Sequence, residues 1–290
     1  MVFSEPETLE EVCHLLSEQP DARCLAGGAS LVAMMNAGLL APSHLISLRK
    51  IPDLANIQAL PDGSVQIGAM ARHADVARYD GFTGAQRIVA AAARRIGHPA
   101  IRNMGTIGGS ICHADPSADY PTAITAADAI VNIAGSGTTR QIPASEFFVD
   151  WLETALEPGE IVVSVVIPPD PSGASVHYEK FTRADGDFAT VSVAVCLRIL
   201  DDVVKTARIA VGGIAEKPVR SPSDENSLIG HPLTEDAIQD FSASLEPLCN
   251  PIDDMRGSAD YRLMLMPRLI HRALSQALKT QLTSDLEGTA

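Results

Sequence analysis

The chain has 290 residues, of which 46% are apolar and 20% charged, so it is long enough for two or three globular domains of roughly 100 to 150 residues each. Its formal net charge of −14 argues against partners such as nucleic acids and anionic membranes, which select clustered Lys and Arg. The first residues lack the basic start and apolar core of a signal peptide, and no stretch approaches the roughly 20 apolar residues of a membrane span, so we expect a cytoplasmic protein.

The first fifty residues alternate between helical and strand patterns. Residues 6–19 place apolar side chains at helical spacing and precede a short strand over Ala22 to Leu25. Leu31 to Asn36 is typical of a short helix, and His44 to Leu48 of a buried strand that a proline ends. We therefore expect a small first subdomain over residues 1–52.

The next segment continues with strands and alanine-rich helices. Val65 to Gly68 follows a Pro-Asp-Gly turn and is predicted to be a strand, after which Arg72 to Val76 begins a helix. Arg87 to Ile96 is rich in alanine and favours a helix, as does the apolar run Pro121 to Ala127. These patterns indicate a mixture of helices and strands.

Strand signals then predominate up to a proline-rich boundary. Ile130 to Ala134 and Gln141 to Pro143 flank a Gly-Ser-Gly turn and are predicted to form a hairpin. Ile161 to Ile167 is rich in β-branched residues and ends at two prolines. The stretch Pro168 to Ser175 is the best candidate for a domain boundary, which closes a second segment over residues 53–172.

The remaining residues, 173–290, are predicted to form a small sheet packed on helices. Thr234 is a candidate N-cap for a helix to Leu248, and Ser258 for a helical region to about Leu282 that Pro267 interrupts. Three strand-like runs indicate an antiparallel meander: Val176 to Thr182, Thr190 to Leu200 and Val203 to Gly212.

Two glycine pairs are the most informative motifs, in Ala26-Gly27-Gly28-Ala29-Ser30 and Thr106-Ile107-Gly108-Gly109-Ser110. Glycine reaches positive φ and has no Cβ, so successive N–H groups can converge on an anion, and two such turns could hold a diphosphate. Either turn taken singly is also compatible with a plain strand-to-helix connection. Neither G-x-G-x-x-G nor G-x-x-x-x-G-K-[ST] occurs, which argues against a Rossmann domain and a P-loop.

The five cysteines are scattered, with an odd count and no C-x-x-C pair. They match neither a disulfide framework nor an iron–sulfur or zinc signature. We expect buried or half-buried thiols, so the chain supplies no metal redox centre of its own.

Several ordered motifs resemble the FAD-binding medium subunit of the molybdenum hydroxylases, the xanthine dehydrogenase and carbon monoxide dehydrogenase family. They are Leu25-Ala26-Gly27-Gly28-x-Ser30-Leu31, Ala41-Pro42-Ser43-His44-Leu45-Ile46, Thr106-Ile107-Gly108-Gly109-Ser110 with His113-Ala114-Asp115-Pro116-x-x-Asp119-x-Pro121, Phe147-Phe148, and Thr154-Ala155-Leu156-x-Pro158-Gly159-Glu160. The resemblance continues to Tyr261-Arg262 and so spans nearly the whole chain.

The resemblance implies an α+β chain. A two-subdomain FAD-binding fold of the vanillyl-alcohol oxidase and p-cresol methylhydroxylase type would be followed by a C-terminal domain of a small antiparallel sheet packed on helices. Residues 1–52 and 53–172 would then be the two FAD-binding subdomains, and residues 173–290 the C-terminal domain.

The resemblance also implies a set of cofactor-binding residues, with no catalytic and no metal-ligating residue. Residues 26–30 and 106–110 would wrap the diphosphate, Asp119 would contact the cofactor, and Ile96 and Val162 would flank it. The full set is Ala26, Gly27, Gly28, Ala29, Ser30, Leu31, Ile96, Thr106, Ile107, Gly108, Gly109, Ser110, Asp115, Asp119, Val162 and Lys180. The first turn offers no histidine for a covalent link, which favours non-covalent FAD.

Several of these residues have structural explanations as well. Asp119 could cap the following helix, and Lys180 could be a solvated residue on the outer face of a strand. Ile96 and Val162 could be core residues. His98, beside the second turn, is more typical of a structural or exposed loop histidine than of a catalytic acid or base.

The family implies two partner subunits, assembled as a dimer of heterotrimers (a heterohexamer). A large subunit hydroxylates the substrate at a molybdenum cofactor, and a small one passes electrons through two [2Fe-2S] clusters to the FAD. The FAD would then reduce an acceptor such as NAD, oxygen or a quinone. Two alternatives remain open: a self-contained flavin oxidoreductase of the same FAD-binding fold, and a non-catalytic flavin-binding module that senses redox state.

Overall fold

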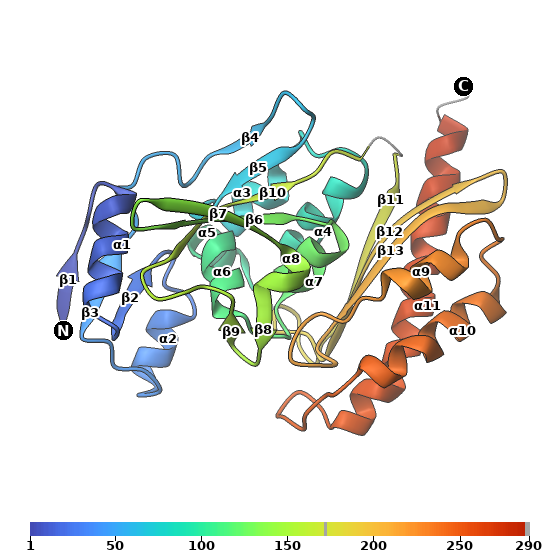
Figure 1. The fold of residues 1–290 in the computed structure, drawn as a ribbon. Helices are drawn as coiled ribbons and strands as arrows, with labels where there is room; N and C mark the ends of the chain where they lie inside the picture. Colours follow the sequence, from blue (N-terminus) through green and yellow to red (C-terminus); the bar gives the residue numbers. More distant parts are fainter. Residues whose placement is uncertain (171–172, 288–290) are drawn as a thin grey trace.

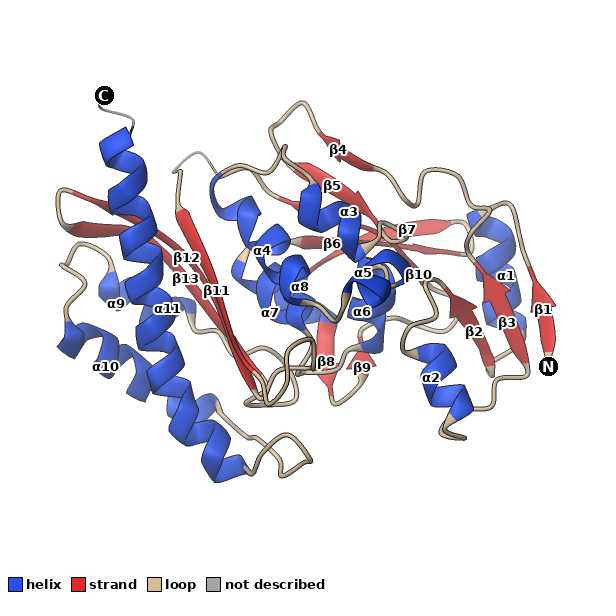
Figure 2. Ribbon diagram, turned by 180° about the vertical axis from the view of Figure 1, so that it is seen from behind, coloured by secondary structure: helices blue, strands red, loops and turns tan. Residues whose placement is uncertain are grey.

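Three β-sheets carry the fold, and Figures 1 and 2 show them from opposite sides. The computed structural model describes residues 1–170 and 173–287. The first sheet is parallel, in the order β1 (Val2–Ser4), β3 (His44–Ser47), β2 (Ala22–Leu25). Helices α1 (Leu9–Glu18) and α2 (Leu31–Asn36) alternate with its strands along the chain, as the sequence patterns predict.

The second sheet lies at the centre of the molecule, between the first sheet and the C-terminal part (Figure 1). Its antiparallel order is β4 (Ile57–Ala59), β5 (Val65–Gly68), β10 (Ile161–Ile167), β6 (Ile130–Gly135), β7 (Thr138–Pro143). The helices that accompany it are α3 (His73–Arg78), α4 (Arg87–Arg95), α5 (Pro99–Met104), α6 (Ile107–His113), α7 (Asp119–Ala126) and α8 (Ala144–Phe147). A short hairpin of β8 (Phe148–Asp150) and β9 (Glu153–Thr154) lies beside them.

The third sheet is the expected antiparallel meander of β11 (Ser175–Phe181), β12 (Val191–Leu200) and β13 (Val203–Gly212). Its helices are α9 (Pro222–Leu228), α10 (Glu235–Leu245) and α11 (Ala259–Glu287). Side chains alternate between its two faces, as a strand requires. Val193 and Val195 join the core beneath α10 and α11, whereas Ala194 and Cys196 join the core of the central part.

Helix α11 corrects one prediction, because it continues through Pro267. Proline removes one intrahelical hydrogen bond and favours a kink or a break. Here the apolar face of α11, including Met266 and Ile270, is buried against the third sheet. This burial outweighs the local preference for a break.

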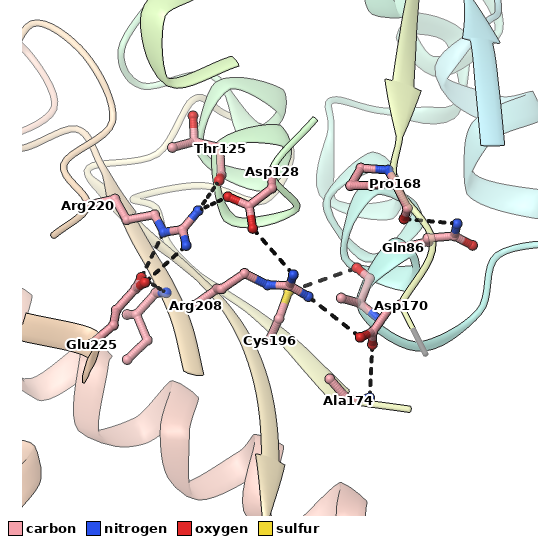
Figure 3. Close-up of polar contacts among 12 residues, drawn as sticks. Gln86, Thr125, Asp128, Pro168, Asp170, Ala174, Cys196, Arg208, Arg220 and Glu225 are labelled. Atoms are coloured by element: carbon pink, nitrogen blue, oxygen red, sulfur yellow. Dashed lines mark hydrogen bonds and ion pairs between the residues drawn. The ribbon is translucent and has the colours of Figure 1, made fainter. Parts of the chain in front are cut away.

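Charged groups fix the C-terminal end of α7 to the third sheet (Figure 3). Arg220 forms ion pairs with Asp128, just beyond α7, and with Glu225 at 2.8 Å. Arg208 of β13 adds a second ion pair to Asp128 at 3.3 Å. The N-terminal end of the same helix carries Asp119, so α7 connects this interface to the predicted site.

The sequence patterns do not predict the short strands β1 and β4 or the helices α5, α6 and α9, which have few residues to carry a periodic signal. The predicted boundary segment Pro168 to Ser175 includes residues 171–172, which lie outside the described residues. Within the described ranges, no helix is both long and apolar enough to cross a lipid bilayer.

Candidate cofactor-binding site

A cavity of about 990 Å³ lies between the two glycine motifs. This volume is at the upper end of the range for ligand pockets. Its wall combines the end of β2 and the first glycine turn, the α5–α6 connection, the β8–β9 hairpin and the start of β10. Lys180 of β11 and the loop residues Gly186, Asp187 and Phe188 complete it from the C-terminal part.

The first glycine turn places unpaired backbone amides on the cavity wall. Gly28 has φ +78°, a conformation that favours glycine. Gly27 packs on the α5–α6 connection so closely that a Cβ there would lie 2.8 Å from the Gly105 Cα atom. Within the described part of the chain, the N–H groups of residues 27–31 donate to no protein acceptor, and all five residues line the cavity. Unpaired amides on a cavity wall are suited to phosphate oxygens.

The second glycine pair does not form a turn like the first one, contrary to expectation. Gly108 and Gly109 lie in the first turn of α6, with no positive φ, after the N-cap Thr106. The Gly108 N–H donates to the Ala69 carbonyl oxygen at 2.8 Å, and the Gly109 N–H to Thr106 Oγ1 at 3.1 Å. Because these amides already donate to protein acceptors, the second glycine pair allows close packing of α6 on Ala69 and does not offer free donors. A Cβ on Gly108 would lie 2.6 Å from the Ala69 Cβ.

Asp119 and Lys180 form a buried ion pair on the cavity wall. Lys180 Nζ lies 2.8 Å from Asp119 Oδ2 and donates to the Arg95 carbonyl oxygen at 3.1 Å. The Tyr178 hydroxyl donates to Asp119 Oδ1 at 2.9 Å. Burial raises the pKa of the Asp119 carboxyl, against the opposing effects of Lys180 and Tyr178. The side chain of Lys180 is 2% exposed, so the interpretation of a solvated residue is wrong.

Most residues of the predicted set line the cavity together. They are residues 26–31, Ile96, Thr106, Gly108, Gly109, Ser110, Asp119, Val162 and Lys180. Two do not line it. The side chain of Ile107 is fully buried in the core, and Asp115 instead accepts from the Ser117 N–H at 2.8 Å and faces Arg256. Ile107 lies in the first turn of α6, where successive side chains point in different directions. Asp115 lies in the connection between α6 and α7.

The prediction missed several lining residues. Among them are Arg23 and Cys24 on β2, His73 on α3, Gly186 to Phe188, and four residues around the β8–β9 hairpin: Leu152, Glu153, Thr154 and Leu156. The motif Thr154-Ala155-Leu156, which is part of the resemblance, could have indicated that the hairpin lies at the site. Arg23, His73 and Phe188 stand in no motif, and only the packing of distant segments brings them here.

The described residues include no group of three or more His, Cys, Asp or Glu side chains placed to hold a metal ion. All five cysteines are free thiols: Cys13 and Cys196 are buried and Cys24 and Cys249 half-buried, as expected, whereas Cys112 is exposed on the cavity wall. Desolvation raises the pKa of Cys24 to about 12, so this thiol is neutral at physiological pH.

Two family models cover the chain in succession. The FAD binding domain in molybdopterin dehydrogenase matches residues 1–170, which is more than half of the chain. The CO dehydrogenase flavoprotein C-terminal domain matches residues 176–277. This chain belongs to the FAD-binding medium subunits of the molybdenum hydroxylases.

Similarity to individual medium subunits extends over nearly the full length. The nicotine 6-hydroxylase medium subunit of Paenarthrobacter nicotinovorans is 35% identical over 275 residues, 95% of this chain and 96% of the relative. The carbon monoxide dehydrogenase medium chain of Hydrogenophaga pseudoflava is also 35% identical, over 95% of this chain and 96% of that one. A solved structure of carbon monoxide dehydrogenase from the same organism superposes with a TM-score of 0.92 at 34% identity, covering 96% and 97% of the two chains.

The residues present in this medium subunit fit FAD. The unpaired amides of residues 27–31 can neutralise phosphate charge as backbone donors, which would reconcile a dinucleotide with a net charge of −14. Ser30 and Ser110 add hydroxyl donors on the cavity wall. The cavity is also mainly bounded by apolar side chains such as Leu31, Ile96 and Val162, as a planar ring system requires.

His73 is a neutral histidine on the wall of this cavity. The residue is 4% exposed, and its ring packs on Tyr120 with a centroid distance of 5.3 Å. Within the described residues, its Nδ1 atom has no hydrogen-bond partner. Burial, with repulsion from Arg102, lowers the pKa of His73 from 6.5 to about 4. The imidazole therefore stays uncharged in the folded medium subunit at neutral pH.

We expect His73 to make the medium subunit less stable in acid. Between pH 6.5 and about 4, His73 is protonated in the unfolded state but stays neutral in the folded state. The free energy of unfolding therefore falls as the pH falls through this range. The loss attributable to this group is at most about 3 kcal/mol. Urea unfolding of wild type and His73→Gln at pH 7 and pH 4.5 measures it, because other titrating groups cancel in the difference. Equal pH slopes for the two proteins would contradict the expectation.

Proposed function

We propose that this medium subunit is the FAD-carrying electron-transfer subunit of a molybdenum-containing hydroxylase or dehydrogenase. A small partner subunit supplies electrons from two [2Fe-2S] clusters, and a large one holds the molybdenum cofactor at which the substrate is oxidised. When bound, FAD exchanges one or two electrons and so connects one-electron donors to a two-electron acceptor. Family membership supports the assignment, and the medium-chain names of the relatives support the partners.

The observation that carries the proposal is the set of unpaired amides in the first glycine turn. Residues 27–31 would hold the diphosphate of non-covalent FAD, together with the hydroxyls of Ser30 and Ser110. Anionic phosphate oxygens form short, strong hydrogen bonds with such donors. The second glycine pair would let the backbone of α6 approach the cofactor closely, and its amides would not donate to the diphosphate.

Lys180 would contact the flavin ring system at the other end of the cavity. Its ammonium group has three donors, of which two are used by Asp119 and the Arg95 carbonyl oxygen. The third is available to a ligand, because Lys180 lines the cavity. A cation here stabilises negative charge on the reduced ring. Asp119 keeps this cation in place, and Ile96 and Val162 would pack on the ring.

The identity of the substrate would be set elsewhere. Relatives of 32–35% identity include medium chains named for nicotine 6-hydroxylase, carbon monoxide dehydrogenase and glyceraldehyde dehydrogenase. One architecture therefore accompanies unrelated substrates, as expected if the substrate binds only to the large partner.

We propose residues 1–52 and 53–172 as the two FAD-binding subdomains, residues 173–290 as the C-terminal domain, and a dimer of heterotrimers as the assembly.

Native mass spectrometry of the tagged chain isolated from its source cell, with metal analysis, tests the proposal. We expect FAD on this chain, iron and molybdenum in the complex, and a mass equal to two copies of three different subunits. A chain that carries FAD but isolates alone, without iron or molybdenum, would favour a self-contained flavin oxidoreductase or a redox sensor. A folded chain that takes up no FAD from an excess would overturn the proposal.

A further inference from the structure

His73 lies on the cavity wall close to the first glycine turn. It is the first residue of α3, and its backbone N–H donates to the Gly105 carbonyl oxygen at 3.0 Å. Gly105 leaves room for the imidazole, because a Cβ there would collide with His73 Nε2. The first glycine turn packs on the same residue, since a Cβ on Gly27 would lie 2.8 Å from the Gly105 Cα. His73 Nε2 and the unpaired amides of residues 27–31 therefore lie near one backbone segment of the cavity wall.

The two ring nitrogens of His73 have different surroundings. Nδ1 is enclosed by protein and has no hydrogen-bond partner within the described residues. Nε2 has no partner in that part of the chain either, yet it is not one of the enclosed unpaired atoms. Because His73 is 4% exposed and lines the cavity, Nε2 is the ring nitrogen that a ligand in the cavity can reach.

The chemistry of a neutral imidazole makes this nitrogen a donor. One ring nitrogen carries a proton and donates, and the other accepts. Phosphate oxygens only accept, so a diphosphate beside Nε2 selects the tautomer with the proton on Nε2. An unprotonated Nδ1 also suits the enclosed position, since buried N–H groups without an acceptor are rarer than buried acceptors without a donor.

Arg102 does not compete for the same ligand atom. This arginine is the charged neighbour that repels a proton on the His73 ring. Its guanidinium donates to the carbonyl oxygens of Ile96 at 2.9 Å and Gly97 at 2.7 Å, and Arg102 does not line the cavity. The imidazole is therefore the side chain that brings a donor to this part of the wall.

We propose that His73 is a further FAD-binding residue, whose Nε2–H donates to an oxygen of the FAD diphosphate. This inference rests on the proposed function, because it requires FAD in the cavity with its diphosphate at the first glycine turn. The ring is already held between Tyr120, at a centroid distance of 5.3 Å, and Gly105. Little side-chain freedom is lost on binding, so most of the hydrogen-bond energy contributes to affinity.

Three substitutions of His73 separate the hydrogen bond from the shape of the side chain. His73→Phe keeps a ring and removes both nitrogens. His73→Gln places an amide nitrogen near the position of Nε2, whereas His73→Asn places one near the position of Nδ1. His231→Phe is the matched control, because His231 is exposed and does not line the cavity. Calorimetric titration of the full chain at neutral pH measures the dissociation constants for FAD and for ADP, which carries a diphosphate without the flavin.

We expect His73→Phe to raise the dissociation constant for FAD by about thirtyfold, the usual effect of losing a hydrogen bond to a charged group. The dissociation constant for ADP should rise by a similar factor, because the lost bond is to the diphosphate. His73→Asn should behave like His73→Phe. His73→Gln should bind FAD only about threefold more weakly than wild type, owing to the ordering of a flexible side chain. His231→Phe should leave both constants unchanged.

A measurement on the wild-type chain does not depend on how the variants fold. NMR of ¹⁵N-labelled histidine shows which ring nitrogen carries the proton, and the spectrum of His73→Gln assigns the His73 signals. We expect the proton on Nε2 in the FAD-loaded chain, and a downfield shift of this proton when FAD or ADP binds. A proton on Nδ1 in the loaded chain would overturn the inference.

Wild-type FAD affinity in His73→Phe would overturn the inference and leave the proposed function standing. Weaker binding of FAD with unchanged binding of ADP would also overturn it, because the acceptor would then lie outside the diphosphate. Equal losses in all three variants at position 73 would show that the shape of the ring matters and Nε2 does not, with the same consequence. A folded wild-type chain that takes up no FAD would overturn the proposed function itself.

Discussion

Replacing Gly27 by valine should abolish the retention of FAD. A Cβ at this position would lie 2.8 Å from both the Met104 carbonyl carbon and the Gly105 Cα. These are backbone atoms, which cannot rotate away as a flexible side chain can. The first glycine turn must therefore shift away from the α5–α6 connection, which displaces the unpaired amides of residues 27–31 on the cavity wall. The flavin absorbance of the purified chain and calorimetric titration with FAD measure the loss.

Gly109→Ala is the matched control for this change. A Cβ at Gly109 would meet Thr106 Oγ1 at 3.1 Å and the Ala26 Cβ at 3.7 Å, so a small adjustment relieves it. We expect its FAD affinity to fall less than about tenfold. Gly108→Val should instead destabilise the fold, because its Cβ would collide with Ala69. Full FAD occupancy in Gly27→Val, with native circular dichroism, would contradict the role given to the first turn.

Replacing Lys180 by methionine should destabilise the chain strongly. The change leaves the Asp119 carboxylate buried, with the Tyr178 hydroxyl as its remaining partner. Removing one member of a buried ion pair costs about 3 kcal/mol or more in the free energy of unfolding. Asp119→Asn in the same chain removes the uncompensated charge and should recover a large part of the loss. Urea unfolding of both single variants and the double variant measures the coupling.

Lys205→Met is the control, since Lys205 is exposed on the same sheet, and its effect should stay below about 0.5 kcal/mol. A coupling energy near zero would show that the Asp119–Lys180 pair does not contribute to the free energy of unfolding.

In the FAD-loaded chain, Lys180→Met should also lower the flavin midpoint potential, because the cation stabilises the reduced ring. An unchanged potential would remove Lys180 from the flavin site.

The two glycine pairs illustrate how far a motif predicts a site. Their place in the resemblance correctly predicts that residues near both pairs share one cavity. Their shared composition also suggests equal backbone roles, and there the expectation is wrong. Gly28 has positive φ beside free amides, whereas the Gly108 amide donates to the Ala69 carbonyl oxygen. That partner follows β5 in the chain, some forty residues earlier, so no local pattern could indicate it.

The sequence by itself determined the family, the order of the main strands, the meander at β11–β13 and most of the cavity-lining residues in the two motifs. These features follow from local signals: periodicity, turn residues and motifs, each carried by neighbouring residues. Only the tertiary structure decided that α11 continues through Pro267, that Lys180 is buried against Asp119, and that Arg256 meets Phe188. Each of these depends on burial and charge pairing between segments far apart in the chain, and such energies can outweigh local preference.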